Sequence, residues 1–250
     1  MIYFIIVLLA TTIGGIAGMG GGVIIKPALD FMGVDIAVAA VLAAVTVLAM
    51  TVVSIVMHSR SKFRIDRDMV LLAAAALVGG VAGNQLFSWA ISAWSDAGVN
   101  MVQIIVSIVL LVFALLKDVV KKTKFTKPTA FIVAGLLLGA VSTFVGIGGG
   151  PINVAVLVVF FGFAVKRAVV ASIFIIMAAQ FVNVVTMMIQ GDMFGYDLTP
   201  LWFMVPAAII GGLVGALLSK KMKDEYVNVI FFTAVSLIIL LNVHNLVSVL

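Results

Sequence analysis

The chain has 250 residues, of which 64% are hydrophobic and 10% are charged, and its mean hydropathy is +1.35. These values exclude a soluble globular domain and indicate an integral membrane protein, with no stretch polar enough to form an extramembrane domain. The net charge of +5 does not indicate nucleic-acid binding, because the basic residues cluster in short loops between apolar segments, and the lack of cysteine excludes disulfides and thiolate metal sites.

The apolar segment at the N-terminus, residues 2–10, is similar to a signal peptide but lacks a basic n-region. It has a counterpart in the second half of the chain, residues 130–141. We therefore expect it to belong to the mature protein.

Six charge-free runs are each long enough to cross ~30 Å of hydrocarbon. They are roughly Ala37–Met57, Met69–Trp89, Val99–Leu116, Ala168–Gln190, Thr199–Ser219 and Tyr226–Val243. Two further apolar regions, residues 2–33 and 130–163, are each interrupted by glycines. The pieces after the glycines are short, which favours half-spanning helices over full spans.

The interrupting glycines repeat. The run Gly18-Met19-Gly20-Gly21-Gly22 returns as Gly146-Ile147-Gly148-Gly149-Gly150. Glycine clusters break helices, and a break within a bilayer is tolerated only where it lines a protein cavity. Matching breaks in two halves point to the binding site of a transporter. A GGxxG sequence also recurs, at residues 79–83 and 211–215, and predicts close helix packing.

The repeat predicts the fold class, an all-α polytopic membrane protein with two inverted-topology repeats. Each repeat would contain a split or re-entrant helical hairpin at the glycine break and three transmembrane helices. The first repeat is residues 1–117 and the second is residues 130–250. A cytoplasmic basic linker, residues 118–129, joins them.

The orientation rests on the lysines and arginines. All of them except Lys26 lie in four loops. If each split segment is a hairpin that leaves the membrane on the side it entered, these loops share one face, which would be cytoplasmic, and both termini would be external. The protein would then lie in the cell (inner) membrane. The alternative, eight plain crossings, divides the basic residues between the two faces and fits less well.

The glycine breaks have the chemistry of an anion site, because convergent N–H groups and the helix N-termini that follow attract negative charge. Lys26 lies four residues after Gly22 in apolar sequence. At that depth it would face a cavity or a ligand; the alternatives are snorkelling or a pair with Asp30. Its counterpart in the second repeat is Val154, beside Asn153. The site would therefore take its charge from one half and amide donors from the other.

Few other polar side chains lie within the spans. Gln180 and Asn183 share a helix face, which would line the pathway or bond to a neighbouring helix. Asn84 is expected at the membrane interface, and His58 and His244 at the surface. The predicted substrate-binding residues are Gly20, Gly21, Gly22, Lys26, Gly148, Gly149, Gly150, Asn153, Gln180 and Asn183.

The spans lack carboxylates and clustered histidines, which disfavours an enzyme and a metal-cation transporter. We expect no cofactor and no metal. The expected partners are a small anionic substrate and the lipid bilayer, with no nucleic acid. A coupling proton or cation and the oligomeric state are left open.

Several motifs together resemble the TauE/SafE sulfite exporter family, also called the toluene-sulfonate uptake permeases. They are the paired GxGGG clusters, the stretch 166–168 leading to Ala171-Ser172, and GGxxG in the penultimate helix of each half. The resemblance covers nearly the whole chain, although residues 39–44 lack the basic and serine positions of their counterpart.

The resemblance implies a secondary transporter of small sulfur-containing anions, such as sulfite, sulfoacetate, other organosulfonates or thiosulfate-like anions, that works by alternating access. The alternative is an anion channel in which the same glycine nests form the filter. Saturable counterflow would support the transporter, and unitary currents would support the channel.

Overall fold

The computed structural model describes residues 1–249 apart from 61–65, 147–148, 192 and 194. In that part of the chain all regular secondary structure is helical, with ten α-helices and one short 3₁₀ helix. They are α1 Ile2–Ala17, α2 Gly22–Phe31, α3 Ile36–Ser59, α4 Arg67–Ala93, α5 Asp96–Leu115, η1 Leu116–Asp118, α6 Pro128–Val145, α7 Gly150–Phe161, α8 Val165–Gln190, α9 Leu201–Lys221 and α10 Asp224–Val249.

Seven of the described helices are long and apolar enough to cross a membrane, judged by length and composition. Six of them correspond to the predicted spans, which confirms a polytopic helical membrane protein. The seventh is α6, which we expected only as the first piece of a split segment. It reaches 18 residues because Pro128 begins the helix two residues before the expected start. A proline fits the first helical turn, where its missing N–H is harmless.

Local chemistry sets where the helices begin and end. The carboxylate of Asp35 accepts a backbone N–H at the start of α3 at 2.9 Å, and Asp66 does the same for α4 at 3.0 Å. Helices α1 and α6 end at Gly18 and Gly146, whose φ angles of 74° and 70° lie in the left-handed region. Glycine adopts that conformation at little cost, so both helices stop where the glycine runs begin.

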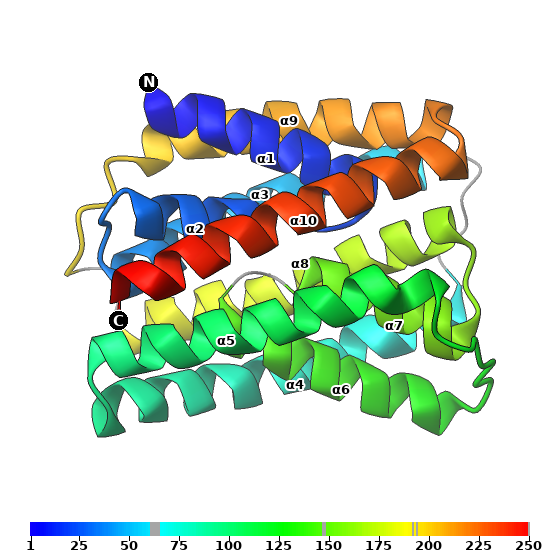
Figure 1. Cartoon of the computed structure of the whole chain (residues 1–250), viewed down its shortest axis with the longest axis horizontal. Helices are drawn as coiled ribbons and strands as arrows, with labels where there is room; N and C mark the ends of the chain where they lie inside the picture. Colours follow the sequence, from blue (N-terminus) through cyan, green and yellow to red (C-terminus); the bar gives the residue numbers. More distant parts are fainter. Residues whose placement is uncertain (61–65, 147–148, 192, 194, 250) are drawn as a thin grey trace.

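Helices α1 and α2 fold back on each other, and so do α6 and α7 (Figure 1). Tyr3, at the start of α1, packs in the same apolar cluster as Val34, which follows α2. In the second pair, the ring of Phe131 in the first turn of α6 lies 4.6 Å from the ring of Phe161 at the end of α7. Each pair therefore starts and ends at one end of the molecule, with its glycine break at the turn.

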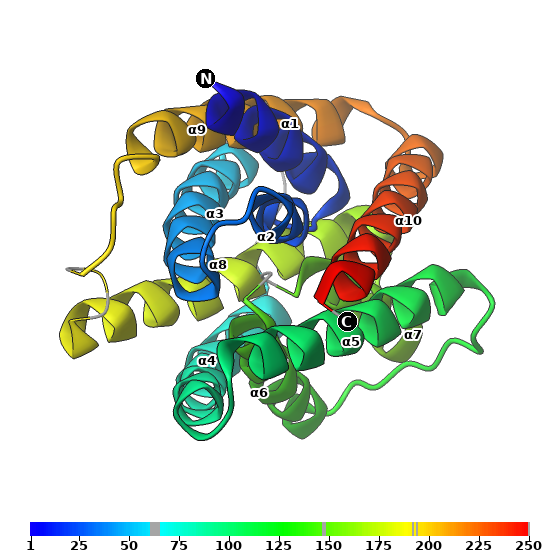
Figure 2. The same cartoon turned by 60° about the vertical axis from the view of Figure 1, so that its left-hand side comes forward.

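The two halves of the chain interlock (Figure 2). Helix α4 of the first half packs along α6 and α8, and α9 of the second half packs along α1 and α3. Helix α5 lies against α7 and α10, and α10 lies against α2 and α5. These contacts occur in equivalent pairs. A contact between a first-half helix and a second-half helix has a counterpart in which the roles of the two halves are exchanged.

Glycines allow the closest of these contacts. A Cβ atom at Gly79 or Gly83 of α4 would overlap the backbone of α6, and one at Gly139 would overlap α4 in return. On α9, Gly211 and Gly215 lie equally close to α1. The prediction that GGxxG marks close helix packing is therefore confirmed.

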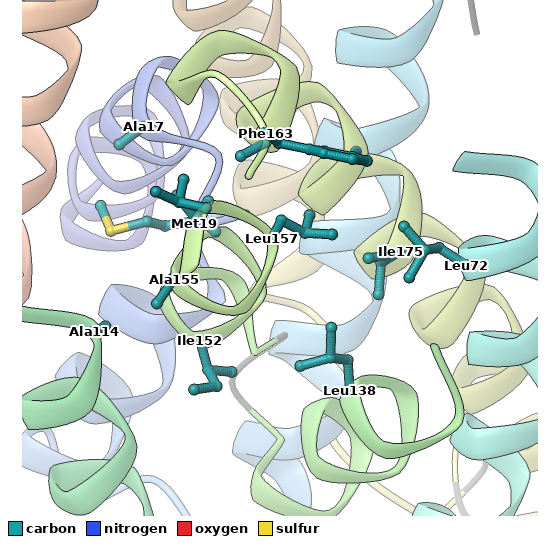
Figure 3. Close-up of a cluster of buried hydrophobic side chains, with 14 of the residues drawn as sticks. Ala17, Met19, Leu72, Ala114, Leu138, Ile152, Ala155, Leu157, Phe163 and Ile175 are labelled. Atoms are coloured by element: carbon teal, nitrogen blue, oxygen red, sulfur yellow. The ribbon is translucent and has the colours of Figure 1, made fainter. Parts of the chain in front are cut away.

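The largest apolar core surrounds the short helix α7. Ala155 and Leu157 have no exposed surface, and their neighbours include Met19 of the first break, Leu138 of α6 and Ile175 of α8 (Figure 3). A helix that is apolar on all sides is expected to be enclosed. Helix α7 is therefore held within protein, which is what an interrupted backbone requires if it lies in a bilayer.

Candidate functional site

The two glycine breaks meet inside the bundle. A Cβ atom on Gly150 would overlap the backbone of Met19, so the start of α7 lies directly against the first break. Helix α8 holds both breaks, because the hydroxyl of Ser172 lies 2.7 Å from the carbonyl oxygen of Gly18 and 3.3 Å from that of Gly150. The sequence placed the breaks at matching positions, and the structure brings them into contact.

The first break turns the chain from α1 into α2. Gly20 and Gly21 both have φ near 75°, and Gly21 is the N-cap of α2, whose first residue is Gly22. All three glycines are buried; Gly20 lies against Ile176 of α8 and Gly21 against Thr11 of α1. The first N–H groups of a helix have no partner within it, so α2 begins inside the protein with donors that its own backbone does not bond.

The second break has the same form. Gly146 follows α6, and Gly149 is the N-cap of α7 with φ 61°. Gly150 is the first residue of α7, and the N–H of Asn153 donates to the Gly149 carbonyl at 3.0 Å. Gly148 lies outside the described residues. Helix α7 thus also begins inside the protein, beside the first break.

Lys26 crosses from the first break to the second. Its side chain is only 2% exposed, and Nζ donates to Oε1 of Gln103 on α5 and, at 3.1 Å, to the carbonyl of Val145. The amide nitrogen of Gln103 in turn donates to the Phe144 carbonyl at 2.5 Å. The ion pairs among the described residues do not include one between Lys26 and Asp30. Lys26 is therefore turned inward and bonded to neutral groups.

The amino group of Lys26 lies at the carbonyl end of α6, because Val145 is the last residue of that helix. The aligned dipoles of a helix place about half a negative charge at this end, which favours a cation. An ammonium has three N–H groups, and the described residues supply two acceptors, from Gln103 and Val145. The third N–H can serve a ligand.

Buried polar side chains without partners lie around the second break. Among the described residues, both amide atoms of Asn153 and the hydroxyl of Ser142 are buried without a hydrogen-bond partner, as are the Thr46 hydroxyl and the amide oxygens of Asn84 and Asn100 elsewhere in the bundle. Ser142 lies directly against Gly149. Because buried polar groups are nearly always paired in folded proteins, the Asn153 and Ser142 atoms mark a place where a polar ligand can bind.

A second polar group lies between α4 and α8. The amide of Asn84 donates to Asn183 at 2.7 Å, and Asn183 donates to Gln180 at 3.2 Å. Asn84 also lines a cavity of about 220 Å³ together with Ser88 and Tyr196. Asn84 was expected at the membrane interface; the structure places its side chain inside the bundle, where it is only 2% exposed. Asn84 lies next to Gly83, on the side of α4 that packs against other helices, and so its side chain points into the bundle.

Other positions also differed from expectation. Gln103 and Ser142 were not predicted, and their only sequence signal is a polar side chain within an apolar helix. His58 was expected at the surface but is only 5% exposed, and its Nδ1 lies 2.7 Å from the Ser54 carbonyl. Lys220 of α9 bonds to the nearby Met57 carbonyl and covers this end of α3.

Short helices that begin at breaks inside a bundle, around a buried charge, are typical of membrane transport proteins. Comparison with known families agrees with this class. A family model described as "Sulfite exporter TauE/SafE" matches residues 3–242, and the chain therefore belongs to this family of membrane transporters. It is also similar to a Bacillus subtilis (strain 168) protein named "Probable membrane transporter protein YunE", with 26% identity over 254 residues that cover 90% of each chain.

Proposed function

We propose that the protein is a secondary transporter of small sulfur-containing anions, such as sulfite, sulfoacetate, other organosulfonates or thiosulfate-like anions. The anion would bind where the two glycine breaks meet, beside Lys26. The observation that carries this proposal is the contact between the breaks, with Ser172 bonded to both and Lys26 reaching from one to the other. Membership of the TauE/SafE family supports the class of substrate.

The charges at this point favour an anion. Helices α2 and α7 both begin here, so the free N–H groups and the positive dipole ends of two helices are directed at one place. Lys26 adds an amino group, and Asn153 adds an amide with unused donors. In the bilayer these fixed donors would replace the hydration shell of the anion.

The membrane topology follows from the folded-back pairs. If α1 with α2 and α6 with α7 are re-entrant hairpins, residues 1–117 and 130–250 are inverted repeats joined by a basic linker at 118–129. The loops that carry the basic residues then share one face, which would be cytoplasmic. Contacts at this end of the molecule support this. Arg167, in the first turn of α8, bonds to Asp66 at 2.5 Å. The backbone N–H of Thr123 in the linker donates to the Val159 carbonyl near the end of α7.

Alternating access would use the interlocked halves. The α4 and α9 helices each pack on the hairpin of the other half, so a shift of these contacts could close one side of the site while opening the other. The cavity beside Asn84 is lined by α3, α4, α8 and Tyr196. Helices α4 and α5 meet at the end of the molecule opposite the basic linker between α5 and α6 (Figure 1). Gln180 and Asn183 would line the path from this cavity toward the breaks.

Counterflow in proteoliposomes tests the proposal. Vesicles that contain the purified protein and unlabelled sulfite, thiosulfate, sulfoacetate or an aromatic sulfonate should accumulate the labelled anion transiently and with saturation. Vesicles with Lys26→Gln should lose this exchange, whereas Lys117→Gln, which alters a buried lysine far from the breaks, should keep it. Unitary currents without saturable exchange would identify a channel instead.

A further inference from the structure

The hydrogen bonds of Lys26 match those of a neutral amine. A lysine amine has two N–H groups, whereas an ammonium has three. The described residues offer two acceptors, the Gln103 amide oxygen and the Val145 carbonyl, and both are uncharged. These two acceptors match the two N–H groups of the amine. The ammonium has one N–H left over and a charge that no carboxylate in contact balances.

Among the described residues, the groups in contact with Lys26 are uncharged, and Asp30 acts on it only through its field. On its own helix Asp30 lies one turn further and is not in ion-pair contact. From α10, the His244 ring lies 5.4 Å from the ring of Phe31, the residue after Asp30. At the point of contact, α5 and α6 contribute only the amide of Gln103 and backbone carbonyls within the described residues. The dipole of α6 and the field of Asp30 offset part of the cost of burying the ammonium, but burial without a carboxylate in contact outweighs them.

The second buried lysine shows the contrast. Lys117 has a fully buried side chain, but its Nζ lies 2.9 Å from a carboxylate oxygen of Asp118 and also bonds to Asn228. It further lies 4.5 Å from the centre of the Phe232 ring, so its charge has both an anionic and an aromatic partner. Lys117 therefore has the charged partner in contact that Lys26 lacks.

From this geometry we propose that Lys26 carries the coupling proton of the transport cycle. A proton from the solution converts the amine into an ammonium, and the new third N–H donates to the bound anion. When the anion leaves, the proton leaves with it and the amine returns to its two neutral acceptors. Anion and proton therefore move together in the same direction, one for one, and the empty site changes sides without a buried charge. This rests on the proposed anion site.

The test uses an anion that does not itself titrate in the assay range, a sulfonate or thiosulfate, so that any proton effect belongs to the protein. Proteoliposomes with an acidic exterior should accumulate a monovalent sulfonate about tenfold for each pH unit of gradient. A pH indicator inside the vesicles should record one proton per anion. A sodium gradient at constant pH should drive no accumulation.

The key variant is Lys26→Arg, because a guanidinium is not deprotonated in proteins. It should still exchange labelled for unlabelled anion at equal pH, but a pH gradient should drive no accumulation. Lys117→Gln is the matched control and should respond to the gradient like the unaltered protein. If Lys26→Arg is inactive in exchange, the proton count on the unaltered protein decides instead.

The possible failures are distinguishable. Saturable anion flux without proton movement, sodium-driven accumulation, or a Lys26→Arg variant that still follows the pH gradient would overturn proton coupling and leave anion transport standing. An absence of saturable flux for every anion tested would overturn the proposed function itself.

Discussion

Ser172 is the residue on which the meeting of the two breaks depends most directly. Its hydroxyl faces one carbonyl oxygen from each break, and it has no exposed surface. Helix α8 is long and continuous, so it offers a rigid support to two short helices that begin in the interior. The geometry of the proposed anion site is therefore set by a residue that need not touch the anion.

We expect Ser172→Ala to destabilise the protein by about 1–3 kcal/mol, because it leaves the buried Gly18 carbonyl oxygen without its donor and removes the contact with Gly150. Denaturant unfolding in detergent measures this loss. Ser92→Ala is the control, since Ser92 is exposed and bonds only within its own helix. Equal stability of the two variants would show that the Ser172 bridge does not hold the breaks.

Gly150 should tolerate no side chain. A Cβ atom there would overlap the backbone of Met19, which cannot move as a flexible side chain could. We expect Gly150→Ala to cost about 1–3 kcal/mol or more through overpacking, measured as a lower melting temperature in detergent. Gly195→Ala places the same methyl group in open space and should melt like the unaltered protein. An unchanged melting temperature for Gly150→Ala would contradict the contact between the breaks.

For single residues of the site, the sequence was informative where a residue type was rare in its surroundings. A lysine and two glycine runs stand out within apolar spans, and all of them converge in the structure. Gln103 and Ser142 did not stand out, because a single polar residue in a membrane helix is common. Their importance depends on backbone groups contributed by distant helices, which no local pattern reveals.

The helix pairs α4 with α6 and α1 with α9 join the halves. Both rely on small residues that bring backbones together, and in lipid such packing replaces the hydrophobic effect as the force between helices. A conformational change that exchanges inward and outward states would have to pass through these contacts. They are therefore elements of mechanism as well as of stability.

We expect Gly83→Leu to separate α4 from α6, because even a Cβ atom at this position would overlap the Ala140 backbone. The result should be loss of monodisperse protein in size-exclusion chromatography, or a strongly lowered melting temperature. Val78→Leu changes the exposed side of the same helix and should have little effect, since Val78 is 62% exposed. Similar behaviour of the two variants would show that close packing at Gly83 is not required.

Helix positions were largely predictable, because long apolar runs between charged loops leave few alternatives. Which helices pack against each other was not predictable. The GGxxG spacing predicted that α4 and α9 pack closely, but not that each packs on the hairpin of the opposite half. Which helices meet is decided by the whole set of faces, and a single sequence contains no record of that pairing.

For the whole molecule, the hairpin proposal and eight plain crossings make opposite predictions. The chain has no cysteine, so single cysteines can be introduced and labelled in intact cells. With hairpins, residue 195 is external and residue 121 in the basic linker is cytoplasmic; with eight crossings both lie on one face. We expect an impermeant maleimide to label Gly195→Cys at once and Lys121→Cys only after permeabilisation. Labelling of both from the same side would contradict inverted repeats.

The central claim is that small sulfur-containing anions bind where the breaks meet, beside Lys26. Anion-dependent thermal stabilisation measures this directly, with chloride at equal ionic strength as the reference. A transported anion at about 100 times its dissociation constant should stabilise the protein by about 2.7 kcal/mol. Lys26→Ala should lose this stabilisation while Lys117→Gln retains it. Undiminished stabilisation of Lys26→Ala by the same anion would contradict the proposed site.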